Sequence, residues 1–424
     1  MNRTVQALRL APLLVPLLAA TTAHAGIEGE GWLLEGFGSL ALNRSNDAVA
    51  TVRADPRNAS GTTLGRHQWD GDSLASLQLT VNPQGSLRGV WQVLAKDDIA
   101  DRFRPRSEWL YASWDASAQW NVKLGRIVLP VFMLSDTRNL GYAQTNARPP
   151  TVLYGVNPIS NMDGASTSWT GRAWGGVLAA DVALGRTRVT LAQGDLHFDR
   201  IGGLAARWSR GGLTLRAGLT SYRADLNSPT VTAALQALAS GATACINCAT
   251  VLADRVRQKG FSGRILALGA SYDAGPYVLQ AELAQRSSNS TLANNAIGWY
   301  ALAGYRFGSL TPYIGAGSVQ DQEPPLGLQT APGAPPQAVA ANAAFEQYLR
   351  SQGGRRSTEL GLRWDVQEGV ALKLQWEHLL KVRDRVYSGG AVLAFPAPPP
   401  IGSYRGPAFD GSVELLTLKL DWVF

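Results

Sequence analysis

Apolar and polar residues alternate with a period of two along most of the chain, in segments of about ten residues. The alternation is clearest at 75–81, 213–219, 277–283 and 370–376. A period of two predicts β-strands with one apolar and one polar face. After the first 25 residues there is no run of the 18 or so apolar residues that a membrane-spanning helix needs. A helical membrane bundle is therefore excluded, and the chain is expected to fold as an all-β protein.

The connections between the predicted strands alternate in length. Short turns are predicted at seven places, which are 82–85, 115–118, 171–174, 210–212, 273–276, 307–309 and 367–369. Between them lie eight long polar stretches rich in Gly and Pro, at roughly 44–71, 97–106, 127–162, 191–202, 223–262, 287–296, 320–354 and 380–411. This alternation predicts about sixteen antiparallel strands, with every long loop at one end and both termini at the other. The stretch 175–190 could hold one long strand or two short ones.

A transmembrane antiparallel β-barrel explains this layout better than a soluble sandwich does. A sandwich buries its apolar faces against each other and has no reason to place every long loop at one end. Outer-membrane barrels have short periplasmic turns, long extracellular loops and apolar-out, polar-in alternation. Charged residues make up only 17% of the chain, below the roughly 25% of soluble domains. Aromatic residues expected in a periplasmic girdle lie near the first strand or beside short turns: Trp32, Trp114, Trp120, Trp169, Trp208, Tyr272, Tyr277 and Trp364.

The first 25 residues have the pattern of a cleaved secretory signal peptide. Arg3 and Arg9 give a positive region, an apolar stretch follows, and Ala23-His24-Ala25 is a small-x-small cleavage site. We therefore expect a signal peptide at 1–25 and a single barrel domain at 26–424. Export of this kind, together with the barrel pattern, predicts the outer membrane of a Gram-negative bacterium as the destination, where lipid and lipopolysaccharide would be partners.

Two segments resemble the porins of Gram-negative bacteria. The last strand ends with Trp422 and Phe424 on one apolar face, which is similar to the C-terminal strand of outer-membrane proteins. The stretch from Gly125-Arg126 through Asp136-Thr137-Arg138-Asn139-Leu140-Gly141-Tyr142 to Arg148-Pro149-Pro150 resembles the third outer loop of a porin-like family. The first resemblance implies recognition of Trp422 and Phe424 by the barrel-assembly machinery. The second implies that residues 127–162 fold inward as a constriction, and the family implies a homotrimer.

The resemblance implies a porin, which lets small hydrophilic solutes diffuse passively through a water-filled lumen, with no cofactor, metal or catalysis. The residues expected at the constriction are Arg126, Asp136, Arg138, Tyr142 and Arg148. The side chains expected to line the pore are Arg88, Lys123, Arg207, Arg216, Glu282, Glu359, Arg363, Lys373 and Glu377. Because charges at a constriction weigh most, the loop arginines favour mild anion selectivity. The alternative is that they only pin the loop to carboxylates of the wall. A solute-specific channel is a second alternative.

Other functions have weaker support. His67 near Asp70, and His197 between Asp195 and Asp199, could activate a water in a barrel enzyme, but scattered loop residues of this kind are usually only solvated. Cys245 and Cys248 form a CxxC motif in a predicted loop, where a disulfide is expected rather than a redox pair. Nucleic-acid binding lacks a reader fold. A surface adhesin stays open, whereas a transporter barrel of about 22 strands with a plug needs a longer chain.

Overall fold

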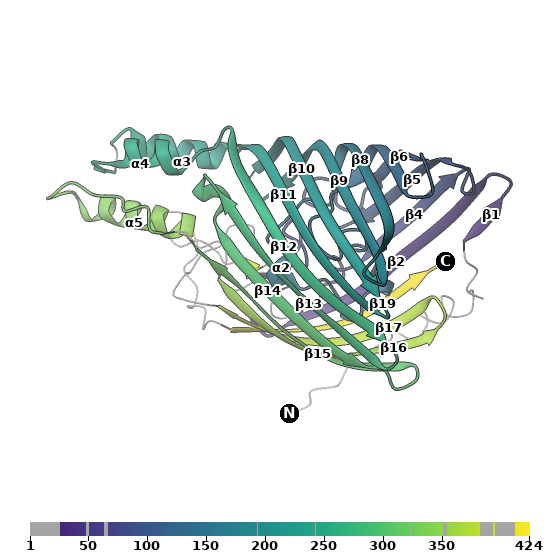
Figure 1. Cartoon of the computed structure of the whole chain (residues 1–424). Coiled ribbons are helices and arrows are strands. Elements are labelled where there is room, and N and C mark those ends of the chain that lie inside the picture. Colours follow the sequence, from purple (N-terminus) through teal and green to yellow (C-terminus); the bar gives the residue numbers. More distant parts are fainter. Residues whose placement is uncertain are drawn as a thin grey trace, which may run out of the picture.

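A computed structural model of the chain describes residues 26–47, 51–62, 67–192, 194–241, 243–322, 324–350, 354–381, 393–394 and 412–424. Within these residues, sixteen antiparallel strands close into a barrel, each pairing with the next and the last with the first (Figure 1). The strands are β2 (Trp32–Ser45), β4 (Leu74–Val81), β5 (Leu87–Lys96), β6 (Arg106–Asp115), β7 (Trp120–Val128), β8 (Asn161–Ala173), β9 (Gly176–Leu191), β10 (Gly194–Arg210), β11 (Leu213–Asn227), β12 (Phe261–Ala274), β13 (Tyr277–Ser288), β14 (Ala296–Tyr305), β15 (Leu310–Asp321), β16 (Arg355–Gln367), β17 (Val370–Lys381) and β19 (Ser412–Val423). The all-β fold and the strand number expected from the sequence are confirmed.

Short elements complete the chain. Strand β1 (Ile27–Gly29) forms a hairpin with β2, and β3 (Thr51–Val52) pairs with β18 (Leu393–Ala394). The helices are η1 (Gly141–Ala143), α2 (Thr151–Tyr154), α3 (Pro229–Ala239), α4 (Cys248–Arg255), η2 (Thr291–Ala293) and α5 (Pro336–Arg350). Figure 1 shows α3, α4 and α5 at one end of the barrel and β1 with the C-terminus at the other. In the part of the chain that is described, none of the helices is long and apolar enough to cross a membrane.

The seven short turns lie where the sequence predicts them, but one predicted long loop is wrong. Residues 191–202 belong to the hairpin of β9 and β10, whose strands already pair at Thr190 and Asp195. The segment is polar because its outward side chains interact across the strands; the Arg188 Nε donates to the His197 Nε2 at 2.6 Å. Residues 176–190 are therefore part of one long strand, with Gly175 in the turn before it. The predicted signal peptide and most of the loop at 380–411 lie outside the described residues.

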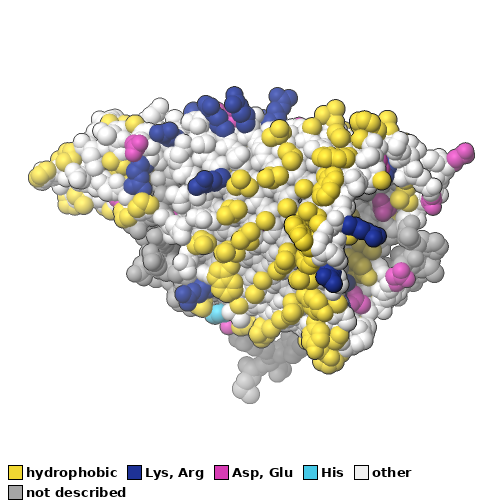
Figure 2. Space-filling view, viewed as in Figure 1, with side chains coloured by type: hydrophobic (Ala, Val, Ile, Leu, Met, Phe, Trp, Pro, Cys, Tyr) yellow, Lys and Arg dark blue, Asp and Glu magenta, His cyan; other side chains and the backbone are white. Residues whose placement is uncertain are grey.

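The wall of the barrel has an apolar outer face. Leu215 and Leu418 are both more than two-fifths exposed, and Leu372 shares the outward face of β17 with the exposed Leu374. Figure 2 shows hydrophobic side chains spread over this wall. Exposed aromatic side chains lie beside the short turns, among them Trp32, Trp114, Trp120, Tyr277 and Trp364. This arrangement is the one that a lipid-facing barrel requires.

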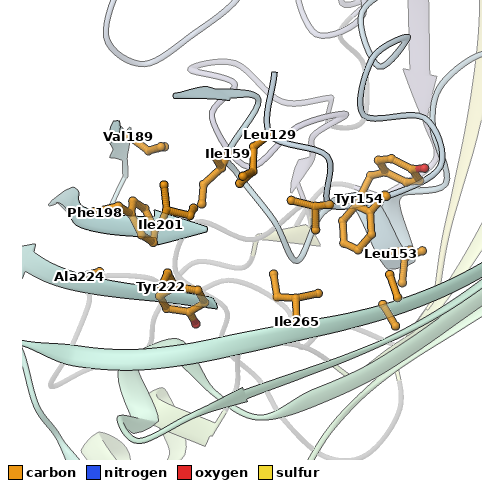
Figure 3. Close-up of a cluster of buried hydrophobic side chains, with 14 of the residues drawn as sticks. Leu129, Leu153, Tyr154, Ile159, Val189, Phe198, Ile201, Tyr222, Ala224 and Ile265 are labelled. Atoms are coloured by element: carbon orange, nitrogen blue, oxygen red, sulfur yellow. The ribbon is translucent and has the colours of Figure 1, made fainter. Parts of the chain in front are cut away.

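The inner face carries an apolar cluster in addition to polar groups. Residues from the long connection between β7 and β8, such as Tyr154 and Ile159, pack against the inward side chains of Phe198, Tyr222 and Ile265 (Figure 3). All five are less than a tenth exposed. The connection therefore lies inside the barrel, where its own apolar side chains help to form a core.

Candidate pore and its inward segment

The segment 129–160, between β7 and β8, is held inside the barrel chiefly by cationic side chains of the wall. An irregular backbone leaves carbonyl groups that need hydrogen-bond donors when they are buried. Arg216 on β11 donates to the Val131 carbonyl at 2.9 Å, and Arg363 on β16 donates to the Tyr142 carbonyl at 2.7 Å. Among the described residues, Arg286, Arg355, Lys373 and Lys419 also donate from the wall to carbonyls of the segment. Much of the cationic inner wall therefore binds the inward segment.

Arg148 lies buried at the centre of an ionic cluster. It donates to Asp72 in the first long loop, and its Nη1 lies 2.9 Å from a Glu377 oxygen on β17. Asn43 and Thr417 accept further hydrogen bonds from the same guanidinium. Burial alone raises the pKa of the Asp72 carboxyl, but the adjacent Arg148 more than offsets this and holds that pKa below its ordinary value. Arg148 therefore links the inward segment to the wall and to the first long loop.

Arg138 is buried in a second ionic cluster. Its Nη1 donates to the Asn157 carbonyl at 2.9 Å, and its Nη2 lies 3.3 Å from Asp55. Asp55 also lies 3.1 Å from the Lys96 ammonium and 3.4 Å from Arg57. Burial raises the pKa of Asp55, but these cations together lower it well below the usual range. Sequence reasoning missed Asp55 and Arg57, because nothing local distinguishes them from solvated loop residues.

The prediction that Arg126 belongs to the constriction is wrong. Its neighbour Leu124 is 67% exposed on the outer face of β7, whereas Ile127 is buried inside. Arg126 shares the face of Leu124, and its Nε lies 2.7 Å from an oxygen of Asp163, which also faces outward. The alternation of β7 continues through this residue without a bulge. The resemblance puts Arg126 at the entry of the loop, whereas the alternation of β7 puts its side chain on the outer face.

The other two predicted constriction residues lie on the inward segment itself. Asp136 is exposed and lines an internal cavity. The Tyr142 ring lies 5.0 Å from the Arg363 guanidinium, and its hydroxyl accepts a hydrogen bond from the Gly369 backbone at 3.2 Å. Tyr142 therefore lies near a short turn and packs against the wall.

A polar cavity of about 300 Å³ lies between the inward segment and strands β6 to β11. Its charged lining residues are Lys123, Asp136, Asp181, Arg207 and Arg216. Serine and threonine side chains of β8 also line it, at Ser166, Ser168 and Thr170. At the short-turn end a second space contains Arg88, which lies 2.8 Å from an Asp115 oxygen. Lys123, Arg207, Arg216 and Arg88 therefore line internal space, in the places where pore-lining residues are expected.

The remaining predicted lining residues are covered by the inward segment. Lys373 is fully buried, with its ammonium 2.8 Å from Asp421, so the expectation that it faces water is wrong. Glu282 accepts hydrogen bonds from the Met133 backbone and the Tyr154 hydroxyl. Glu359 and Glu377 are also less than a tenth exposed. These side chains face inward as predicted, but they contact protein because the segment lies on top of them.

His197, one of the candidate catalytic histidines, lies on β10 where that strand pairs with β9. His197 accepts a hydrogen bond from Arg188, and no group of three or more His, Cys, Asp or Glu side chains there could hold a metal ion. Cys245 and Cys248 are joined by a disulfide at the start of α4. Trp422 and Phe424 lie at the seam, where the Phe424 backbone exchanges hydrogen bonds of 2.9 and 3.0 Å with Gly36.

Solved structures of bacterial outer-membrane proteins, among them an anion-selective porin, have the same architecture. The anion-selective porin from Comamonas acidovorans superposes with a TM-score of 0.52 at 14% sequence identity, covering 93% of this chain and 100% of that one. Salmonella typhi OmpF, in complex with daunomycin, gives 0.52 at 12% identity, covering 94% and 99%. Vibrio cholerae OmpT in a trimer form gives 0.51 at 9% identity, covering 93% and 100%.

Comparison by sequence finds no relatives: no family model matches the chain, and no curated protein matches it. At the identities above, the structural likeness establishes the fold. The chain has the sixteen-stranded closed barrel of the outer-membrane porins.

Proposed function

We propose that the chain is an outer-membrane porin through which small hydrophilic solutes diffuse passively. The observation that carries this proposal is the placement of segment 129–160. It fills one side of the barrel and leaves a polar cavity of about 300 Å³ against β6 to β11. Sixteen strands enclose an aqueous channel that side chains of the wall alone do not fill. The inward segment would then act as the constriction.

Conductance in a planar lipid bilayer tests this function. The refolded full chain is expected to give stepwise currents in KCl at both polarities. In Ser166→Cys, whose side chain lines the cavity on β8, modification of the thiol by a bulky disulfide-forming reagent is expected to reduce the current until a reductant is added. The matched control is Arg126→Cys, on the outer face, whose modification is expected to leave the current unchanged. Absence of conductance from folded wild-type protein would refute the proposal.

The proposed channel has a mild preference for anions, carried by Lys123 and Arg207. These two line the polar cavity with Arg216 against Asp136 and Asp181. Arg138 and Arg148 are buried against carboxylates, so they contribute little to the field in the lumen. Reversal potentials across a KCl gradient are expected to shift towards cation preference in Lys123→Ala and Arg207→Ala. Arg356→Ala, exposed on β16, is the control that leaves the potential unchanged.

The proposed position in the membrane follows from the outer face. Five arginines lie towards the long-loop end of β7, β9, β11 and β12, at Arg126, Arg186, Arg188, Arg223 and Arg264, and all but the half-buried Arg126 are exposed. Guanidinium groups pair well with phosphates, so this row fits the phosphate groups of lipopolysaccharide in the outer leaflet. A tag inserted between α3 and α4 is then readable on intact Gram-negative cells, whereas a tag in the turn at 82–86 is not. The reverse result would invert the topology.

Two further parts of the proposal concern assembly. A signal peptide at 1–25 would direct export, and the C-terminal strand with Trp422 and Phe424 would be the segment that the barrel-assembly machinery recognises. A homotrimer is the proposed state, supported by the trimer form of the similar Vibrio cholerae barrel. Chemical crosslinking on whole cells tests it: a ladder that stops at three copies is expected, and a monomer band alone would contradict it.

A further inference from the structure

An apolar cavity of about 140 Å³ lies inside the long-loop end of the barrel. Its walls include Leu196, Phe198, Tyr222, Phe261, Ile265 and Leu292. Figure 3 shows Phe198, Tyr222 and Ile265 gathered on neighbouring strands, with Ile159 of the inward segment opposite them. The inner wall of a diffusion channel is normally polar. A cavity with an apolar lining at this place therefore calls for an apolar occupant rather than a hydrated ion.

Two buried hydrogen-bond donors line the same cavity without a partner among the described residues. The Asn294 side chain is 1% exposed, and its Oδ1 accepts from Arg286, so the amide orientation is set and Nδ2 is left as a donor. Arg355 is 4% exposed, and its Nη2 donates to the Thr151 carbonyl while its Nε has no acceptor. Buried donors are nearly always paired in folded proteins. Both therefore indicate a ligand that supplies acceptor oxygens.

The ligand class follows from these two observations. We propose that this cavity binds a small monocarboxylate with an apolar body, whose two oxygens accept from Asn294 and Arg355. A cavity of about 150 Å³ holds a benzene ring, so the available volume fits one six-membered ring. An amine is disfavoured as the ligand, because Arg355 is positively charged and because Asn294 and Arg355 offer unpaired donors rather than an unpaired acceptor. The apolar lining disfavours a sugar. Benzoate is the probe that combines the required features.

This inference rests on the proposed channel function and names a solute class for it. The first experiment is calorimetric titration of the refolded full chain with benzoate, benzyl alcohol and acetate. Benzyl alcohol keeps the ring without the charge, and acetate keeps the charge without the ring. Benzoate is expected to bind at least about tenfold more tightly than either, since a charge-assisted hydrogen bond contributes at least that factor. Equal affinities for the three, or no binding of benzoate, would overturn the inference.

Two substitutions with matched controls test the site itself. Asn294→Asp keeps the acceptor for Arg286 but replaces the free donor with a negative oxygen, so benzoate binding is expected to fall by about tenfold or more. Asn295→Asp, one residue along, is the control. Ile265→Phe fills the cavity and is expected to abolish binding, whereas Leu266→Phe, on the exposed outer face, leaves it intact. Equal binding by Asn294→Asp and Asn295→Asp would overturn the inference.

Conductance of the same proteins separates this inference from the function on which it rests. All four variants are expected to conduct KCl as the wild type does, because the polar cavity along β6 to β11 is untouched. A wild type that conducts normally but does not bind benzoate would refute the proposed binding site without contradicting the porin function. A wild type that binds benzoate but does not conduct would refute the proposed channel function. It would also refute the claim that the site serves transport.

Discussion

Arg148 is bound to Asp72 by two hydrogen bonds, Nε to Oδ1 at 3.0 Å and Nη2 to Oδ2 at 2.8 Å, although the two residues are 76 positions apart. Both side chains are buried, and Glu377 of the barrel wall joins them. The pair connects the first long loop to the inward segment. It thereby helps to decide how much of the lumen the segment occupies.

Removing the Arg148 side chain should greatly lower the free energy of unfolding of the barrel. Arg148→Ala leaves Asp72 and Glu377 buried without their cation, so we expect the free energy of unfolding to fall by about 3–5 kcal/mol. Denaturant titration in detergent measures it. Arg126→Ala removes an exposed ion pair of similar geometry and is expected to cost only about 0–1 kcal/mol. Equal costs for the two variants would show that the buried cluster contributes no more than a surface pair.

The pair of Arg148 and Asp72 should also make the stability of the fold depend on pH. The pKa of Asp72 in the folded chain lies below its ordinary value of 3.8, because Arg148 outweighs the effect of burial. The stabilisation is therefore fully present above pH 3.8 and is lost as the pH falls through the folded pKa. Unfolding measured between pH 7 and pH 2 should show this loss. In Asp72→Asn the acid-dependent fall should be smaller, and an unchanged fall would assign the acid sensitivity to other carboxylates.

Lys373 and Asp421 should be energetically coupled. Their charged atoms lie 2.8 Å apart with neither side chain exposed. A double-mutant cycle of Lys373→Ala and Asp421→Ala is expected to give an interaction energy of about 0.5–3 kcal/mol, which is the range for directly contacting buried groups. Replacing Lys373 alone should destabilise the barrel. If Lys373→Ala is neutral, the segment does not cover this residue in solution.

A charged side chain on the outer face should destabilise the barrel in a lipid bilayer. Leu418 is 44% exposed on β19 and lies opposite Leu42 and Leu374 in the sheet. Leu418→Arg is expected to cost about 2–4 kcal/mol in a lipid bilayer, if the residue lies near its midplane. Folding into lipid vesicles measures this, with Leu418→Met as the conservative control. In a bilayer, equal stability of the two variants would place Leu418 away from lipid.

Deletion of Phe424 should affect assembly in cells more than refolding in detergent. The residue contributes two backbone hydrogen bonds to Gly36 and one apolar side chain. Burial of such a side chain contributes about 1.5–3 kcal/mol, which a barrel of this size tolerates in detergent. A recognition signal acts before folding, so outer-membrane levels should drop sharply. Normal levels of the truncated chain would argue against the proposed signal.

Local sequence patterns predicted most of the barrel. Period-two alternation and turn residues are properties of short segments, so the strand number and the seven short turns could be predicted without long-range information. The hairpin at 191–202 could not, because its charged outward residues make a strand look like a loop. The pairing of Arg188 with His197, which explains them, appears only once β9 and β10 are aligned.

The candidate site was harder to predict, because burial inside a barrel depends on residues far along the chain. Lys373 has the same local pattern as a water-facing lysine, yet it donates to the carbonyl of Gly141, which is 232 positions away. Arg126 was expected inside because the loop pattern starts there, but a strand residue changes face with each step of register. The unpaired donors of Asn294 and Arg355 have no local sequence signal at all, because both are defined by what surrounds them.

The seam between β2 and β19, where the barrel closes, has a consequence for folding. The Ser39 hydroxyl on β2 donates to the Asp421 carboxylate on β19 at 2.5 Å, across 382 positions. Until β19 is in place, β2 has no partner on that side, so a partly folded barrel carries two open sheet edges. Open edges invite pairing with other chains, and contacts this distant in sequence form slowly. Partly folded copies therefore need to be kept apart from one another until the final strand has paired.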